Sequence, residues 1–276
     1  MVGLTIPSTD NIFDEEKGKF NTFTKIKKME TIIPYLKPAV GSVYSYSWGI
    51  MKKYFLPLFL LLLLTSILSA PVGIPDRNNH NIKHEICQSD DWHVVFKNMD
   101  AGHSPGSVLL GIFALFYTLF VINPLNYGAK YLRLKAIRKT DFEVKEVFDV
   151  FKNYLNVVLA ALLASSIIII GFVFLIIPGI VFACRLAFVP YLVMDKKLDP
   201  VKAVEESWRL TRGYGWKIFW MAILAFFIGI AGLLCLVFGI IFSIIWISLA
   251  FAAMYQAVLQ EKNHVEIKTA DLQQNQ

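Results

Sequence analysis

The chain has 276 residues, of which 56% are hydrophobic and only 17% are charged, and its formal net charge is +6. Soluble domains carry about 25% charged residues, so this composition excludes an ordinary soluble protein and favours a membrane protein. The basic residues lie beside hydrophobic runs, so the expected partner is anionic lipid of the inner leaflet, and no nucleic acid is expected. The three cysteines lack the spacing of a metal module, and the polar start lacks a cleavable secretory signal.

Six apolar runs of 16 to 23 residues come close to or reach the length that a membrane-spanning helix needs, which is about 17–25 residues. One or two such runs would also fit buried helices of a soluble protein, but six in a chain with so few charges favour the bilayer. Unpaired backbone polar groups are costly in hydrocarbon, so each run is expected to be helical. The predicted fold class is therefore all-α, a polytopic membrane protein with six transmembrane helices at Phe55–Ala70, Val108–Tyr127, Leu155–Ile177, Gly179–Met194, Trp216–Phe238 and Gly239–Leu259.

Basic residues alternate along the connections between these runs. Eight Lys or Arg residues precede the first run, seven lie in 126–153 and six in 195–217, whereas 72–107 holds only three beside five acids. The turns at Pro178-Gly179 and Phe238-Gly239 hold none. By the positive-inside rule both termini are expected in the cytoplasm. This predicts a cytoplasmic polar tail at 1–38, a six-helix membrane domain at 39–259 with an outer loop at 72–107, and a cytoplasmic C-terminal tail at 260–276.

Three stretches before the first, third and fifth runs share one spacing: an aromatic residue, a basic residue four positions later and a tyrosine six positions later. This predicts three repeats, each an amphipathic helix lying on the inner leaflet followed by a transmembrane hairpin. Aromatic belts and positive-inside bias also place such residues at membrane surfaces, which is the alternative explanation. The residues expected at the lipid interface are Trp48, Lys52 and Tyr54, then Phe148, Lys152 and Tyr154, then Trp208, Arg212 and Tyr214.

The part of the chain from about 140 to 258 shows a resemblance to known proteins. Ile176-Ile177-Pro178-Gly179-Ile180, then Arg185, Pro190, Asp195 and Ala203-Val204-Glu205-Glu206-Ser207-Trp208 carry the similarity. The sequence resembles a family of bacterial integral membrane proteins that includes the membrane domain of some glycerophosphoryl diester phosphodiesterases and uncharacterised relatives. The resemblance implies a multi-helix domain in the bacterial inner membrane. It implies no phosphodiesterase activity, because that catalytic barrel needs a few hundred residues and the longest non-spanning stretch is 1–54.

Arg185 is the one charged residue expected well inside a predicted span. It follows the predicted turn at Pro178-Gly179 by a few residues, or about 9 Å along a helix, which places it near the outer surface. Three interpretations stand: the side chain reaches the outer headgroups, pairs within the bundle, or contacts a ligand. Arg185 is therefore a speculative ligand-binding residue.

The outer loop gathers most of the histidines. Four of its side chains, His80, His84, Cys87 and His93, are weak candidates for metal ligands, and the alternative is simply a polar loop outside the membrane. No cofactor is expected.

The predicted spans hold no pair of acids and no nucleophile with a base, so no enzyme is expected. The main hypothesis is a non-enzymatic multi-pass protein that organises the membrane or envelope, or serves as a subunit for a membrane partner or a second copy. A transporter or channel for a small or lipid-like solute is an alternative, favoured by the helix breakers Asn123-Pro124 and Pro190. An accessory role in lipid-headgroup (glycerophosphodiester) metabolism is a further alternative, which rests on the resemblance alone.

Overall fold

The computed structural model describes residues 35–69, 109, 112–114 and 116–274. All regular structure in these residues is helical. The predicted outer loop and most of the predicted N-terminal tail lie outside the described residues. The elements are α2 (Val40–Lys53), α3 (Phe55–Ser69), the π-helix η2 (Thr118–Ile122), α7 (Asn123–Ile137), the 3₁₀-helix η3 (Val144–Asn153), α8 (Tyr154–Phe174), α9 (Ile176–Arg185), α10 (Val189–Asp195), α11 (Pro200–Thr211), α12 (Gly215–Leu234) and α13 (Leu236–Gln274).

Within these residues, five helical stretches are long and apolar enough to cross a membrane, and a sixth results if α2 and α3 are taken together. The five cover 112–137, 144–174, 176–195, 215–234 and 239–266. The axes of α2 and α3 differ by 91° across Tyr54, so this pair is a bent element. By itself α3 has 15 residues, or about 22 Å of helix, which is less than the roughly 30 Å of a bilayer core.

The second stretch is longer than the sequence predicted. It does not end at Tyr127 but continues through η2 and α7 to Ile137. Pro124 is accommodated because it lies in the first turn of α7, directly after the wider π-helical turn. It offers no N–H to the carbonyl of Phe120 four residues earlier, and the Tyr154 hydroxyl donates to that carbonyl at 2.9 Å. The predicted connection 126–153 is therefore mostly helix.

Both short turns lie a few residues before their predicted positions. The chain reverses at Leu175, which has extended backbone angles (φ −168°, ψ 151°), and at Cys235. Pro178 fits in the first turn of α9, where its missing N–H removes no helical hydrogen bond. The glycines serve close packing instead: a Cβ on Gly179 would lie 2.6 Å from the Phe172 ring, and one on Gly239 would overlap the carbonyl oxygen of Gly232.

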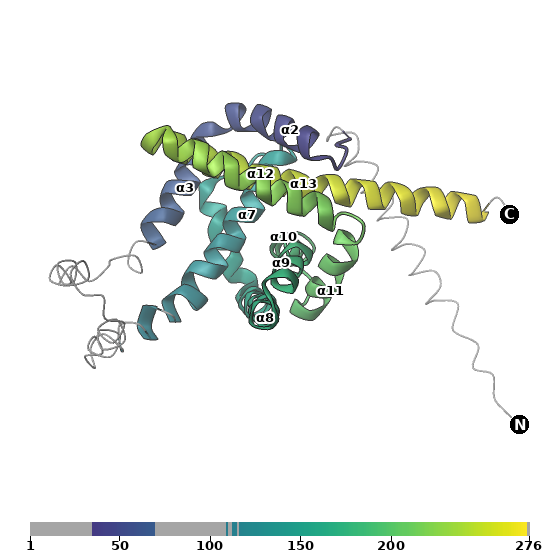
Figure 1. Ribbon diagram of the computed structural model, residues 1–276, viewed down its shortest axis with the longest axis horizontal. Helices are drawn as coiled ribbons and strands as arrows, with labels where there is room; N and C mark the ends of the chain where they lie inside the picture. The colour runs from purple at the N-terminus through teal and green to yellow at the C-terminus, as the bar shows by residue number, and fades with distance from the viewer. Residues whose placement is uncertain (1–34, 70–108, 110–111, 115, 275–276) are drawn as a thin grey trace, which may run out of the picture.

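The core is built around α13, which runs across the whole molecule in Figure 1. Between Leu249 and Val258 nearly every side chain on α13 is fully buried, whichever way it points. A helix that is apolar all round is a buried helix, and here α12, α2, α7 and α11 all pack against it. The alanines in this run allow these neighbours to approach the α13 backbone closely.

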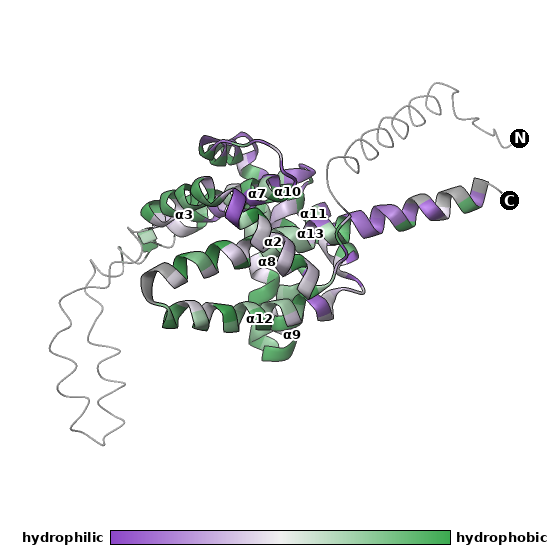
Figure 2. Cartoon of the chain, turned by 90° about the horizontal axis from the view of Figure 1, so that it is seen from above, coloured by the Kyte–Doolittle hydropathy of each residue, from purple (hydrophilic) through white to green (hydrophobic). Residues whose placement is uncertain are grey.

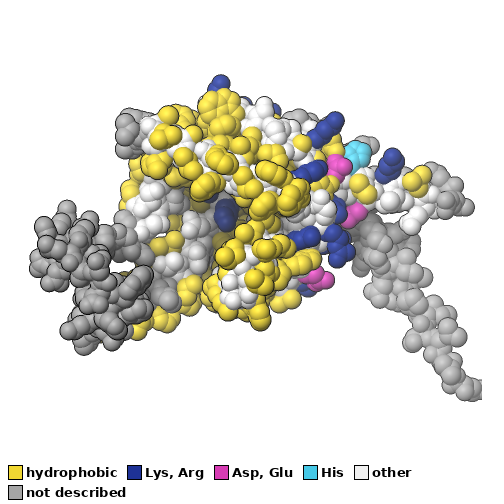
Figure 3. Space-filling view, viewed as in Figure 1, with side chains coloured by type: hydrophobic (Ala, Val, Ile, Leu, Met, Phe, Trp, Pro, Cys, Tyr) yellow, Lys and Arg dark blue, Asp and Glu magenta, His cyan; other side chains and the backbone are white. Residues whose placement is uncertain are grey.

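Polar and apolar surfaces are separated along the molecule. Figure 2 shows the last part of α13 as hydrophilic, in contrast to the apolar hairpins. In Figure 3 most charged side chains lie on the right, near α11 and the middle of α13, whereas apolar side chains cover the centre. We call the first region the charged end; it holds the ion pairs of Arg138, Asp195, Lys196, Glu206 and Arg209, with Lys135 on α7 one helical turn before Arg138 and Glu261 on the adjoining part of α13. The hairpin end is the opposite one, where α12 turns into α13 at Cys235 (Figure 1).

The three segments expected on the membrane surface differ in their junctions. The 91° bend separates α2 from α3, η3 continues into α8 within one stretch, and Gly213 (φ +89°) separates α11 from α12. Only a residue without a Cβ adopts that φ without strain.

The three segments bury equivalent positions. Val201 and Phe148 are exposed, whereas Ser47, Val147 and Ser207 are fully buried. The buried residue is thus the one directly before the aromatic in each segment.

Candidate functional site

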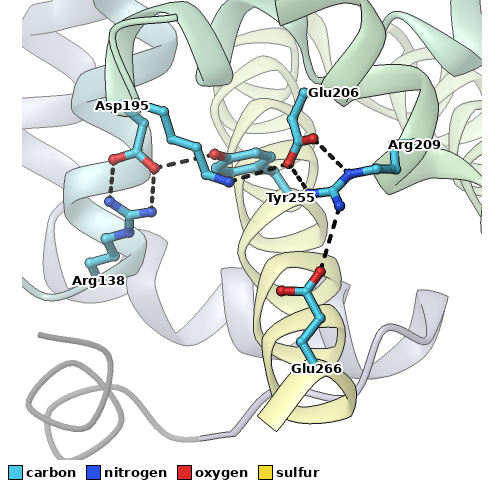
Figure 4. Close-up of polar contacts among 7 residues, drawn as sticks. Arg138, Asp195, Glu206, Arg209, Tyr255 and Glu266 are labelled. Atoms are coloured by element: carbon cyan, nitrogen blue, oxygen red, sulfur yellow. Dashed lines mark hydrogen bonds and ion pairs between the residues drawn. The ribbon is translucent and has the colours of Figure 1, made fainter. Parts of the chain in front are cut away.

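A buried ion pair joins three helices at the charged end (Figure 4). Arg138, the residue after α7, donates from Nη1 and Nη2 to the two carboxylate oxygens of Asp195 at 2.5 and 2.7 Å. Its Nε donates to the side-chain oxygen of Gln256 on α13 at 2.8 Å. The Tyr255 hydroxyl donates to Asp195 Oδ2 at 3.2 Å. We call these four residues the Arg138 cluster, and it ties α7, α10 and α13 together.

The Arg138 cluster holds helices in place and is not suited to proton transfer. Burial acts to lower the pKa of Arg138, but the hydrogen bonds and charge of Asp195 outweigh it and raise that pKa further. A guanidinium with a raised pKa keeps its proton at every physiological pH. Two parallel N–H···O⁻ bonds fix the orientation of both groups. The cluster therefore fixes the positions of α7, α10 and α13 relative to one another.

A second set of ion pairs ties α11 to its neighbours (Figure 4). Glu206 accepts from Arg209 Nε at 2.8 Å and from Lys196 Nζ at 3.4 Å. Arg209 also lies 3.7 Å from a carboxylate oxygen of Glu266 on α13. Partial burial acts to raise the pKa of Glu206, but the hydrogen bond from Arg209 and the charge of Lys196 hold it below its usual value. This carboxylate is therefore ionised at neutral pH and holds α11 against the bundle.

Two basic residues on α7, Lys130 and Arg133, lie where the sequence predicted a connecting loop. They belong to the continuous stretch 112–137. Neither has a carboxylate partner among the residues that the structure describes; the Lys130 ammonium lies 5.8 Å from the Tyr127 ring centre. In Figure 3 a basic side chain is visible in a hollow between apolar ones, in the area that α7 occupies in Figure 1. Both residues were predicted in a loop because the predicted second span ended at Tyr127.

An apolar groove lies between α9 and α12. Its part nearer the charged end has a volume of about 320 Å³ and continues into a larger part of about 550 Å³ toward the hairpin end. Ile180, Cys184 and Phe219 line both parts. Among the described residues, Arg185 is the single charged one that lines it. Pockets of this size and lining are typical of sites for small apolar or amphipathic molecules.

The Arg185 side chain lies at the end of this groove beside α11. Its guanidinium carbon lies 5.4 Å from the Trp208 ring centre, which is within the range of a cation–π contact. Nη1 is fully buried and has no hydrogen-bond partner among the described residues. The carbonyl oxygen of Arg185 accepts from the Ser207 hydroxyl at 2.7 Å.

The predicted distance of Arg185 from its turn needs correction. Because the chain turns at Leu175 and not at Pro178-Gly179, Arg185 lies about 15 Å along the helix from that turn. Its neighbours are Trp208 and Gly215, at the junction of α11 and α12. This junction borders the charged end.

The residues predicted at the lipid interface have individual partners. Lys52 lies 5.2 Å from the Trp48 ring centre, and Trp48 packs on Trp246 of α13 at 5.0 Å. Lys152 pairs with Asp149 at 2.8 Å, Phe148 stacks on Phe151, and Arg212 is exposed. Trp208 is half-buried and packs against Phe182 and Arg185. Tyr54, Tyr154 and Tyr214 each stand at the start of the following apolar helix.

The four weak metal candidates, His80, His84, Cys87 and His93, lie outside the described residues. Within the part of the chain that the structure describes, no group of three or more His, Cys, Asp or Glu side chains is placed to hold a metal ion.

These features define an all-helical protein with five or six apolar helices that are able to span a membrane, held by ion pairs at one end. Residues 146–266 match the model of a family described as "Domain of unknown function (DUF7847)". The matched part holds Asp195, Arg185 and the groove, but the description of the family assigns no function. No link to the phosphodiesterase-associated membrane domain is shown by this match. No curated protein and no solved structure matches the chain.

Proposed function

We propose that the chain is a six-span protein of the cell membrane, with both termini in the cytoplasm. The observation that carries this proposal is the exposed apolar surface of the helices. Many large apolar side chains are more than half exposed, among them Leu155 on α8, Ile177 on α9, and Phe226 and Leu234 on α12. Soluble monomers rarely expose contiguous apolar patches above a few hundred Å². The hydrocarbon of a bilayer is the solvent that such a surface matches.

The charge distribution supports the orientation. Lys135, Arg138, Lys196 and Arg209 gather at the charged end, whereas the turns at Leu175 and Cys235 carry no charge. A cytoplasmic charged end satisfies the positive-inside rule. The helix α13 then leaves the membrane there with its polar part, which agrees with a cytoplasmic C-terminus.

A recurring burial pattern supports the threefold repeat. Ser47, Val147 and Ser207, one position before the aromatic, are fully buried, and the residues three positions further on are buried as well. The basic residues Lys52, Lys152 and Arg212 are exposed in all three segments. Chance placement of aromatic and basic residues at a surface does not produce equal burial at equivalent positions. Each segment therefore serves as a surface anchor for the apolar helices that follow it.

For the role of the protein we favour a non-enzymatic subunit that organises the membrane through a protein partner or a second copy. The end of α13 supports this role, since it projects beyond the helical bundle (Figures 1 and 2). Val265 and Leu272 on this projection are 53% and 58% exposed. They are seven residues apart, so they share one face of the helix. Such a face pairs with another helix.

A photo-crosslinking amino acid placed at Val265 or Leu272 tests this role in intact cells. We expect a protein adduct of one defined mass at both positions, because both lie on the same face. If the partner is a second copy, the adduct has twice the 31.3 kDa of the chain. Lys202 on α11, which is exposed but outside this face, is the control position and is expected to give no adduct. Correctly inserted protein without an adduct at either α13 position would contradict the proposed role.

A specific observation favours passage of a small or lipid-like solute as a second candidate function. Lys130 and Arg133 lie inside the stretch 112–137, which also contains the π-helix η2, and lack acidic partners among the described residues. Charged groups within a membrane usually face protein or water and often mark a solute path, and π-helical turns are frequent at functional sites. Solute flux into proteoliposomes would distinguish this function from that of a subunit.

A further inference from the structure

The groove between α9 and α12 opens toward the surface that we assign to lipid. Its rim residues Ile177 and Trp216 are 73% and 67% exposed, and both lie on outward faces of their helices. Among the described residues that line the groove, the side chains are apolar apart from Cys184 and Arg185. In a bilayer, acyl chains can enter this groove from the side, along the part of α12 from Trp216 to Phe226.

Arg185 gives this groove a charge that nothing in the described part of the chain neutralises. Its Nη1 is buried without a hydrogen-bond partner, and no carboxylate lies within ion-pair distance. Buried polar atoms are nearly always hydrogen-bonded, so an unpaired guanidinium nitrogen calls for an acceptor. Trp208 fixes one side of the group at 5.4 Å, which leaves its other donors for a ligand. A planar guanidinium binds phosphate through two parallel hydrogen bonds.

We propose that this groove binds one anionic phospholipid from the cytoplasmic leaflet, with its phosphate on Arg185 and an acyl chain along Ile180, Cys184 and Phe219. The proposal rests on the membrane-spanning function given above. The position of Arg185 fits the headgroup, because it lies at the groove end that borders the charged end. The apolar continuation toward Phe226 fits the chain.

Gly215 keeps the site open at its charged side. A Cβ at this position would lie 3.9 Å from both Cζ and Nε of Arg185, and these two side-chain atoms are its nearest neighbours within 4 Å. A larger side chain therefore enters the space that the phosphate would occupy without meeting the protein backbone. Gly215 begins α12, where a substitution does not disturb a preceding helical turn.

The test is native mass spectrometry of the full-length protein in neutral detergent, with equal amounts of phosphatidylglycerol and phosphatidylcholine that carry identical acyl chains. We expect wild type to retain one phosphatidylglycerol with a preference of about tenfold over phosphatidylcholine, because charge-assisted hydrogen bonds distinguish the two headgroups. Arg185→Gln is expected to abolish the preference. Gly215→Leu is expected to reduce binding of both lipids. This variant still tests the groove if Arg185→Gln does not fold.

Arg212→Gln is the matched control, because Arg212 is an exposed arginine close to the same junction. It is expected to retain the wild-type preference. Equal binding of both lipids by wild type, an undiminished preference in folded Arg185→Gln, or undiminished lipid binding by folded Gly215→Leu would overturn the groove proposal alone. Recovery of the chain as a monodisperse protein without detergent would overturn the membrane-spanning function together with it.

Discussion

Replacement of Asp195 by asparagine is expected to lower the free energy of unfolding by about 3–5 kcal/mol, which is the usual cost of removing one partner from a buried ion pair. The side chains of Arg138 and Asp195 are only 14% and 12% exposed, so water cannot replace the lost charge. The Arg138 guanidinium would remain buried between α7 and α13. Thermal unfolding of the purified protein in detergent, followed by loss of helical circular dichroism, measures this effect.

An exposed ion pair provides the control for this prediction. Asp149 and Lys152 form a pair of similar distance, but their side chains are 45% and 77% exposed. Exposed pairs contribute little, so Asp149→Asn is expected to unfold like wild type. The double variant Arg138→Met/Asp195→Leu is expected to recover part of the loss, because it leaves no unpaired charge. An Asp195→Asn protein as stable as wild type would show that the Arg138 cluster does not hold the three helices.

Substitution of Gly232 by valine is expected to destabilise the α12–α13 hairpin by about 1–3 kcal/mol or more, as overpacking of a tight core does. A Cβ on Gly232 would lie 2.7 Å from the carbonyl oxygen of Gly239 and 2.8 Å from Ser243 Cβ. Backbone atoms cannot move aside as a flexible side chain does, so the two helices would have to separate. Chemical or thermal unfolding in detergent, with the yield of monodisperse protein as a second readout, measures the loss.

Gly229, three residues earlier on the same helix, is the matched control. A Cβ there would meet no atom within 4 Å. Gly229→Ala is therefore expected to be neutral or to stabilise the protein by up to about 1 kcal/mol, because alanine loses less conformational freedom in a helix. If Gly232→Val and Gly229→Ala behaved alike, the close contact between α12 and α13 would not be a determinant of the fold.

Much of the architecture was accessible from the sequence because hydrophobicity and helical periodicity are local properties. The apolar runs from Leu155 onward correspond to α8, α9 with α10, α12 and α13. The tyrosines at the starts of α3, α8 and α12 were also predicted, because each follows an aromatic residue by six positions. Such features depend on residues a few positions apart, so one sequence suffices to find them.

Features that depend on packing were not accessible in this way. The turns were predicted at prolines and glycines, yet Pro178 lies inside α9 and Gly239 inside α13, since the first turn of a helix tolerates proline and close helix contact needs glycine. That error placed Arg185 about 9 Å from its turn, whereas it lies about 15 Å from it. The partners Arg138 and Asp195 are 57 positions apart, and nothing local indicates that they meet.

The side of the membrane to which each end of the bundle belongs is most directly tested by thiol labelling of intact cells. Cys87, in the predicted outer loop and outside the described residues, provides the reporter once Cys184 and Cys235 are replaced by serine. Thr269→Cys on the exposed end of α13 provides the opposite reporter in a protein that lacks the other three thiols. We predict that an impermeant maleimide labels Cys87 in intact cells and labels position 269 only after the membrane is opened. The reverse order, or labelling of both positions in intact cells, would contradict a six-span protein with its charged end in the cytoplasm.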